Sequence, residues 1–155
     1  MNECKLSEIN WTKAAVFAGG DRGHYRTDFD CFVGVDRGSL WVLEEKLPLA
    51  LAVGDFDSVT VEEGQLIHAR AQHFVQAQPE KDDTDLELAL LTIFEKNPQA
   101  QVTIFGALGG RIDHMLANVF LPSNPKLAPY MRQIEIEDGQ NLISYCPEGT
   151  SQLEP

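Results

Sequence analysis

The chain has 155 residues, of which 43% are hydrophobic, and its formal net charge is −12 at pH 7. This length suits one α/β domain with a sizeable core, or one domain plus a fragment of another. The negative charge repels nucleic-acid phosphates and anionic membranes, so neither is expected as a partner. It also repels a free nucleotide unless cations lie between the two.

The three cysteines, Cys4, Cys31 and Cys146, are widely spaced and form no CxxC pair. A disulfide framework or a zinc site is therefore not expected. The polar residues 1–10 lack the apolar segment of a signal peptide, and the apolar stretches elsewhere are far shorter than a membrane span. We therefore expect a cytoplasmic protein.

Short apolar runs alternate with helical patterns along most of the chain. We expect strands at 14–20, 31–38, 49–55, 72–77 and 101–107, and helices at 39–46, 61–70, 82–97 and 111–121. Strands that are apolar throughout and alternate with helices indicate a mostly parallel sheet covered on both faces. The sequence therefore predicts an α/β fold.

The pattern changes after residue 121. Three prolines mark a connector, and residues 131–138 and 141–146 then have strand patterns on either side of Asp138-Gly139, a hairpin signal. An isolated hairpin is marginally stable in water. This hairpin is expected either to pair with the sheet already present or to begin a second β domain.

Polar clusters follow nearly every predicted strand. In an open parallel sheet, ligands bind beyond the carboxyl ends of the strands. The residues expected at that edge are Gly19, Gly20, Asp36, Asp55, Asp57, Lys81, Asp82, Thr84, Asp85, Gly109, Gly110, Arg111 and Asp113.

Several aspartates at one edge repel one another unless a cation lies among them. Mg²⁺ fits, because it prefers carboxylate oxygens and shares its coordination shell with phosphate oxygens. Asp55 and Asp57 point to the same side of an extended strand, so both can reach one ion if the backbone through Phe56 stays extended.

Each cluster also has a simpler explanation. GDFDS, residues 54–58, is rich in turn residues, DDTD at 82–85 suits a helix N-terminus, and GALGGR at 106–111 suits a flexible loop. The clusters argue for a binding site because they occur together at the ends of several strands.

The chain resembles the catalytic domain of bacterial thiamine pyrophosphokinases. The resemblance rests on FAGG at 17–20, VDRGSLWVLEEKLPLALAVGDFDSV at 35–59, KDDTDLELAL at 81–90 and GALGGRIDHMLANVFL at 106–121. Each motif alone is weak, but together, at these separations, they form a specific set. One departure is Arg37, where a small or acidic residue is more usual.

The resemblance implies a Rossmann-like three-layer fold and a Mg²⁺-dependent transfer of the pyrophosphoryl group of ATP to the hydroxyl of thiamine, with AMP as the second product. It implies that Asp55, Asp57 and Asp82 hold the metal and act in catalysis. The same resemblance implies that nucleotide and substrate contact Gly19, Gly20, Asp36, Lys81, Thr84, Asp85, Gly109, Gly110, Arg111 and Asp113.

The resemblance also implies a homodimer and a second, β-sandwich domain. Residues 1–125 would form the catalytic α/β domain, and residues 126–155 a connector and the first strands of an incomplete β-sandwich. Two other functions stay open on the sequence alone: a nucleotide-binding module without turnover, and a metal-dependent phosphohydrolase that uses the same aspartates.

Overall fold

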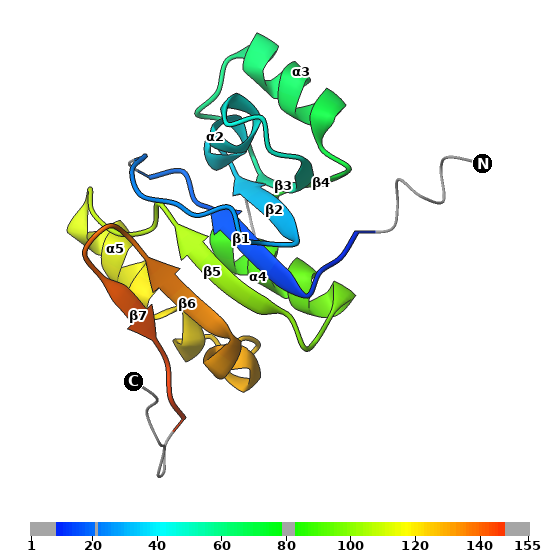
Figure 1. Cartoon of the computed structure of the whole chain (residues 1–155). Coiled ribbons are helices and arrows are strands. Elements are labelled where there is room, and N and C mark those ends of the chain that lie inside the picture. Colours follow the sequence, from blue (N-terminus) through cyan, green and yellow to red (C-terminus); the bar gives the residue numbers. More distant parts are fainter. Residues whose placement is uncertain (1–8, 21, 79–82, 148–155) are drawn as a thin grey trace.

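The computed structural model describes residues 9–20, 22–78 and 83–147. A seven-stranded sheet with strand order β4-β3-β2-β1-β5-β6-β7 forms its centre (Figure 1). All neighbouring strands are parallel except β6 and β7, which are antiparallel. The strands are β1 (Lys13–Phe17), β2 (Cys31–Val35), β3 (Leu49–Gly54), β4 (His73–Gln76), β5 (Gln101–Phe105), β6 (Ile134–Glu137) and β7 (Leu142–Ser144).

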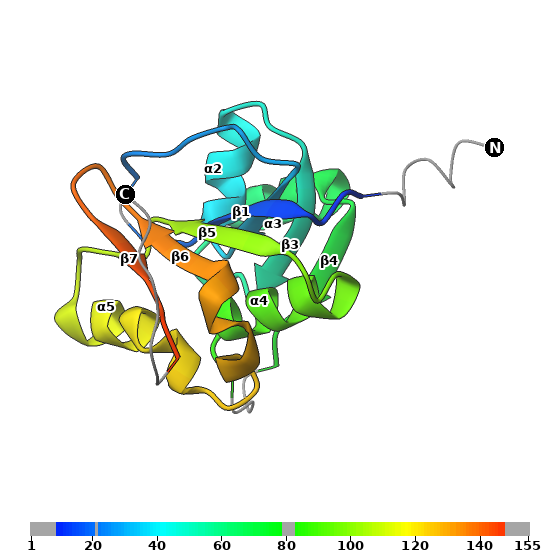
Figure 2. The same cartoon turned by 60° about the horizontal axis from the view of Figure 1, so that its bottom comes forward.

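Helices cover both faces of the sheet, as the continuous apolar strands predict. Figure 2 shows α2 on one side and α4 and α5 on the other. The helices are α2 (Gly38–Glu44), α3 (Val61–Arg70), α4 (Asp85–Lys96) and α5 (Ile112–Val119), and two 3₁₀ turns, η1 (Leu121–Ser123) and η2 (Ala128–Gln133), lead into β6. The predicted mostly parallel α/β fold is confirmed.

Two buried clusters form the core, one on each face of the sheet. Leu90 and Ile93 of α4 belong to one cluster, while Trp41 of α2 and Ile67 of α3 belong to the other. All four side chains are at most 4% exposed. The central strands β1, β2, β3 and β5 are thus almost wholly buried, and their ends are what remains accessible to ligands.

Helix α4 begins later than residue 82, where the acidic run suggested its start. Thr84 is its N-cap: the Glu87 N–H donates to the Thr84 hydroxyl at 3.1 Å, and the Thr84 N–H donates to the Glu87 carboxylate at 2.8 Å. This reciprocal capping box satisfies two N–H groups at the helix start. It fixes Asp85 as the first helical residue.

The C-terminal hairpin joins the sheet of the α/β unit. Strand β6 pairs in parallel with β5, and β7 pairs with β6. Of the two alternatives for this hairpin, the structure shows pairing with the existing sheet, so β6 and β7 do not open a separate one. The boundary expected near residue 125 falls inside one continuous sheet, and the second β domain stays a prediction.

The chain reverses direction across the sheet between β1 and β5. From β1 it proceeds outward through β2, β3 and β4, and it then returns through α4 to β5 on the other side of β1. The carboxyl ends of β1 and β5 therefore flank the crevice where open α/β sheets bind ligands. Among the described residues, no helix is both long and apolar enough to span a membrane.

Candidate active site

A cleft of about 430 Å³ lies at the carboxyl edge of the sheet. Its walls come from the segments after β1, β2 and β5, from the start of α4 and from one face of α5. Eight of the residues predicted from sequence line it: Gly19, Gly20, Asp36, Thr84, Asp85, Gly109, Gly110 and Arg111. The strand-end clusters, far apart in the sequence, thus meet around one cavity.

The backbone segments that follow β1 and β5 lie in close contact at the base of the crevice. A Cβ atom at Gly20 would lie 2.2 Å from the carbonyl oxygen of Gly106. Only glycine permits this approach, because any side chain would overlap the carbonyl group. The glycines after β1 therefore let the two central strand ends meet at the base of the cleft.

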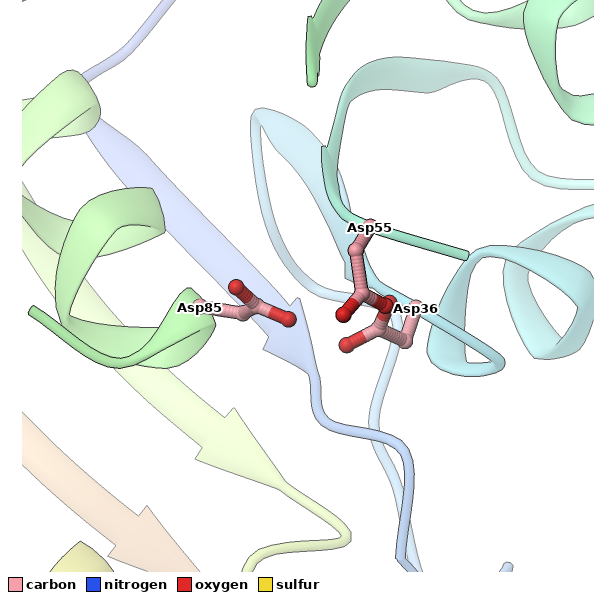
Figure 3. A group of neighbouring side chains, drawn as sticks. All are labelled: Asp36, Asp55 and Asp85. Carbon is pink, nitrogen blue, oxygen red and sulfur yellow. The ribbon is translucent and has the colours of Figure 1, made fainter. Parts of the chain in front are cut away.

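Three carboxylates converge beside this cleft. Asp36 follows β2, Asp55 follows β3 and Asp85 opens α4, and their side chains point toward one another (Figure 3). One carboxylate oxygen from each lies within 4.8 Å of the other two. Three separate elements therefore present negative charge to one small volume.

The local backbone holds Asp36 in place. Asp36 has a left-handed φ of 49°, which aspartate tolerates better than most residues, and its Oδ1 accepts a hydrogen bond of 3.0 Å from the Phe56 N–H. Gly54 gives the carboxylate room, because a Cβ there would lie 2.2 Å from Asp36 Oδ1. The glycine before Asp55 is thus needed for the packing of Asp36.

Negative charge accumulates in this cluster. Burial and a hydrogen bond shared with the Asp85 carboxyl raise the pKa of Asp36 to about 7, and the negative charges of Asp85 and Asp55 act in the same direction. The bond from the Phe56 N–H lowers the pKa but does not outweigh them. A carboxyl group that resists ionisation at neutral pH indicates a place where a cation would be stabilised.

The spacing of the three carboxylates fits one magnesium ion. With Mg²⁺–oxygen distances of about 2.1 Å, ligand oxygens in an octahedron lie about 3.0 Å apart when adjacent and about 4.2 Å apart when opposite. The three carboxylate oxygens lie within 4.8 Å of one another, so binding one ion would draw the side chains closer together. Three carboxylates also leave coordination positions for water and phosphate oxygens.

Comparison with known proteins gives this site a context. Residues 23–133 match the model of the thiamin pyrophosphokinase catalytic domain. The chain belongs to the thiamin pyrophosphokinase catalytic-domain family.

Individual relatives agree with this assignment. A thiamine pyrophosphokinase from Bacillus subtilis strain 168 is 37% identical over 145 residues, which make up 90% of this chain and 66% of that protein. A solved structure of a thiamin pyrophosphokinase family protein from Enterococcus faecalis has 46% identity and a TM-score of 0.83, over 89% of this chain and 67% of that one.

A crystal structure of the Bacillus subtilis thiamine pyrophosphokinase gives 34% identity and a TM-score of 0.67, over 84% of this chain and 62% of that one. The chain thus spans about two thirds of the length of these thiamine pyrophosphokinase relatives.

The expected pairing of Asp55 with Asp57 required an extended backbone, and this condition is not met. Phe56 between them has a φ of 61°, and its ring stacks on Phe74 with centroids 5.0 Å apart. The chain therefore turns after Asp55, and the Asp57 N–H donates to Asp55 Oδ1 at 3.1 Å. Among the described residues Asp57 lies outside the three-carboxylate cluster, and its role as a ligand stays a prediction.

The structure places only one of the three remaining predicted residues, Asp113. Lys81 and Asp82 lie outside the described residues. Asp113 does not line the cleft; instead, the Arg111 guanidinium donates to both its carboxylate oxygens, at 2.7 and 3.2 Å. This pair is on the surface, with side chains 73% and 60% exposed, and a role of Asp113 in the site stays a prediction.

Two members of the carboxylate cluster were expected in other roles. The family resemblance had placed Asp36 and Asp85 among the nucleotide and substrate contacts. The cleft further includes four residues of α5 that were not among the predicted site residues, His114, Met115, Ala117 and Asn118. Their spacing places them on one helical face, which is the signal that would have found them.

Proposed function

We propose that this chain carries the catalytic site of a thiamine pyrophosphokinase, which transfers the pyrophosphoryl group of ATP to the hydroxyl of thiamine and forms thiamine diphosphate and AMP. The observation that supports it most is the cluster of Asp36, Asp55 and Asp85 beside the 430 Å³ cleft of a family member. A cation held by these carboxylates would lie next to space for a phosphorylated ligand.

Asp36, Asp55 and Asp85 are the residues proposed to hold Mg²⁺, and Asp57 and Asp82 are further proposed ligands from the sequence. A bound Mg²⁺ neutralises phosphoryl oxygens and orients the chain of phosphates. It also explains how a protein with a net charge of −12 binds ATP, since the ion shields the carboxylates from the phosphates.

The other residues act by positioning. Gly109 and Gly110 line the cleft without side chains, which lets a phosphate approach the backbone closely. Arg111 supplies a cationic group for phosphoryl oxygens, and Asp113 orients it. Such transfers depend mainly on in-line alignment and charge neutralisation, and Asp82 is the proposed acceptor of the thiamine hydroxyl proton.

The direct test measures AMP formation with ATP and Mg²⁺, in the presence and absence of thiamine. The proposal requires AMP that depends on thiamine and appears together with thiamine diphosphate. Binding of ATP and Mg²⁺ without product would favour the nucleotide-binding module instead. Phosphate release that is independent of thiamine would favour the phosphohydrolase.

A homodimer is also part of the proposal. Helix α5 exposes an apolar stripe of Ile112, Leu116 and Phe120, whose side chains are 68%, 45% and 62% exposed. Apolar residues at this helical spacing usually face a packed surface. Analytical ultracentrifugation of the protein and of a Phe120→Glu variant tests this part, and a wild-type monomer at high micromolar concentration would contradict it.

A further inference from the structure

A second, smaller cavity of about 70 Å³ lies beside the cleft, on the α2 side of the β1 end. It shares Gly19 and Gly20 with the cleft, and its other walls include Arg22, Arg37 and Trp41. One buried water needs at least about 10–15 Å³, so this cavity has room for a group larger than a single water.

The cavity is cationic, in contrast to the surface as a whole. Arg22 and Arg37 are two of the 12 lysines and arginines of the chain, against 24 acidic residues. Among the described residues of the cavity wall, the one acidic residue is Glu44, which forms an ion pair with Arg22. Two guanidinium groups in one cavity repel each other, and an anion between them would relieve the repulsion.

Both arginines keep donors for a ligand. Each guanidinium has five N–H groups. Among the described residues, Arg22 uses Nη1 for Glu44, and Arg37 uses Nη1 for the Ser58 carbonyl oxygen at 2.8 Å and approaches Glu63 at 3.7 Å. The two side chains are 47% and 49% exposed, so both are accessible from solvent.

These same contacts hold the arginines in place before a ligand arrives. The Arg22 guanidinium lies 5.7 Å from the centroid of the Trp41 ring, a cation–π contact that adds to its pairing with Glu44. Arg37 is fixed by the loop that follows Asp55. A binding site whose groups are already oriented loses little side-chain entropy on binding.

We propose that this cavity is an anion site for a phosphoryl group, separate from the carboxylate cluster and independent of a divalent cation. Guanidinium groups recognise phosphoryl oxygens through paired N–H donors. The glycines at positions 19 and 20 leave their part of the wall without side chains. A phosphorylated ligand in the cleft reaches this cavity across Gly19 and Gly20. The anion site is argued from the cavity and does not rest on the proposed function. The identification of its ligand as ATP or thiamine diphosphate does rest on that function.

The experiment is calorimetric titration of the protein with inorganic diphosphate in EDTA, at constant ionic strength. We compare wild type with Arg22→Gln and Arg37→Gln, with Arg111→Gln in the main cleft, and with Arg70→Gln on the exposed end of α3 as the matched control. Loss of one charged hydrogen-bonding group weakens binding by about tenfold or more. We expect this loss for Arg22→Gln and Arg37→Gln, and a change of less than about twofold for Arg70→Gln.

Trp41 provides a second measurement. The chain has two tryptophans, and a Trp11→Phe background leaves Trp41 as the only tryptophan emitter. Diphosphate bound beside Arg22 changes the surroundings of the Trp41 ring, so we expect a saturable fluorescence change that Arg22→Gln abolishes. Thermal unfolding of each variant confirms that it is folded.

Three results would overturn the proposal: no saturable binding to wild type, an equal loss in all four arginine variants, or a loss only in Arg111→Gln. The last result would place the anion in the main cleft. Repeating the titration with AMP and with thiamine diphosphate then identifies the source of the phosphoryl group. Because the assay contains neither thiamine nor Mg²⁺, its failure leaves thiamine-dependent AMP formation untouched, and the two proposals fail independently.

Discussion

Replacing Asp36 by asparagine tests whether the carboxylate cluster stores electrostatic strain. Asparagine keeps the shape of the side chain, tolerates the φ of 49°, and retains an oxygen to accept the Phe56 N–H. It cannot ionise. The substitution therefore removes one charge from the cluster while preserving the local backbone, so the effect on stability reports the cost of a charge at this position, from burial first and from the neighbouring aspartates second.

The magnitude follows from the pKa. Burial raises the pKa of Asp36 from 3.8 to about 7, and each pKa unit corresponds to about 1.4 kcal/mol, so ionising this group in the fold costs at most about 4 kcal/mol. Partial exposure to solvent and adjustment of Asp55 and Asp85 reduce this, and about 2 kcal/mol is the expected gain for Asp36→Asn above pH 7. For a domain of this size, that is about 4–8 °C in Tm.

The sign of the pH dependence is fixed by the direction of the shift. The native state binds the Asp36 proton more tightly than the unfolded state, so the wild type loses stability as the pH rises from about 4 to about 7. The advantage of Asp36→Asn should be near zero at pH 4, grow through this range, and level off above pH 7.

Thermal and urea unfolding in EDTA at pH 4, 6 and 8 measures this advantage. Asp57→Asn, which removes an exposed charge outside the cluster, is the matched control and should change stability by less than about 0.5 kcal/mol. Adding Mg²⁺ at pH 8 should stabilise the wild type and close the gap, because ligand binding to the native state raises its stability. A destabilised Asp36→Asn at pH 8, or a gap that does not vary with pH, would refute the reasoning.

Three further predictions concern the same edge of the sheet and its supports. Asp55→Asn should weaken Mn²⁺ binding at least about tenfold by calorimetry, and Asp57→Asn should weaken it less, because Asp57 lies outside the three-carboxylate cluster; unchanged binding for Asp55→Asn would contradict the cluster as the metal site. Gly54→Ala should lower the free energy of unfolding by about 2 kcal/mol or more, because its Cβ would lie 2.2 Å from a cluster oxygen. Gly64→Ala, a helical position with 3.8 Å of clearance, should instead stabilise by up to about 1 kcal/mol; the same sign for both would contradict the packing argument. Glu137→Gln should lower the free energy of unfolding by about 1 kcal/mol at pH 7, because a neighbouring arginine lowers the pKa of the Glu137 carboxyl. In urea unfolding, this difference in free energy should fade as the pH drops through 4.

The order and type of the elements could be predicted from sequence because they depend on local periodicity. The helix at 61–70 was predicted at the bounds that α3 has, and every predicted strand is present but ends earlier than predicted. The ends were less accurate because glycines and aspartates after each strand belong to the ligand edge and not to the ladder. Helix α4 begins at Asp85, later than the predicted residue 82. Acidic residues are spread over positions 82–87, but only Thr84 and Glu87 form the capping box that fixes the start of the helix.

Apolar periodicity could not show which side of α5 faces the cleft. Ile112, Leu116 and Phe120 have the spacing of a core-facing stripe, yet they are exposed, and His114 and Asn118 line the cleft. The sequence pattern records that a face is apolar, but it does not record what covers that face.

By itself, the sequence determined that aspartates and glycines meet at the carboxyl edge of a parallel sheet. That conclusion needs only strand order and the rule that parallel strands end together. The tertiary structure decided which aspartates share a site. Phe56 stacks its ring on Phe74 where the chain bends, and Asp55, not Asp57, lies in the cluster with Asp36 and Asp85. Which carboxylates meet depends on the fold around this bend, and no local pattern in the sequence encodes that choice.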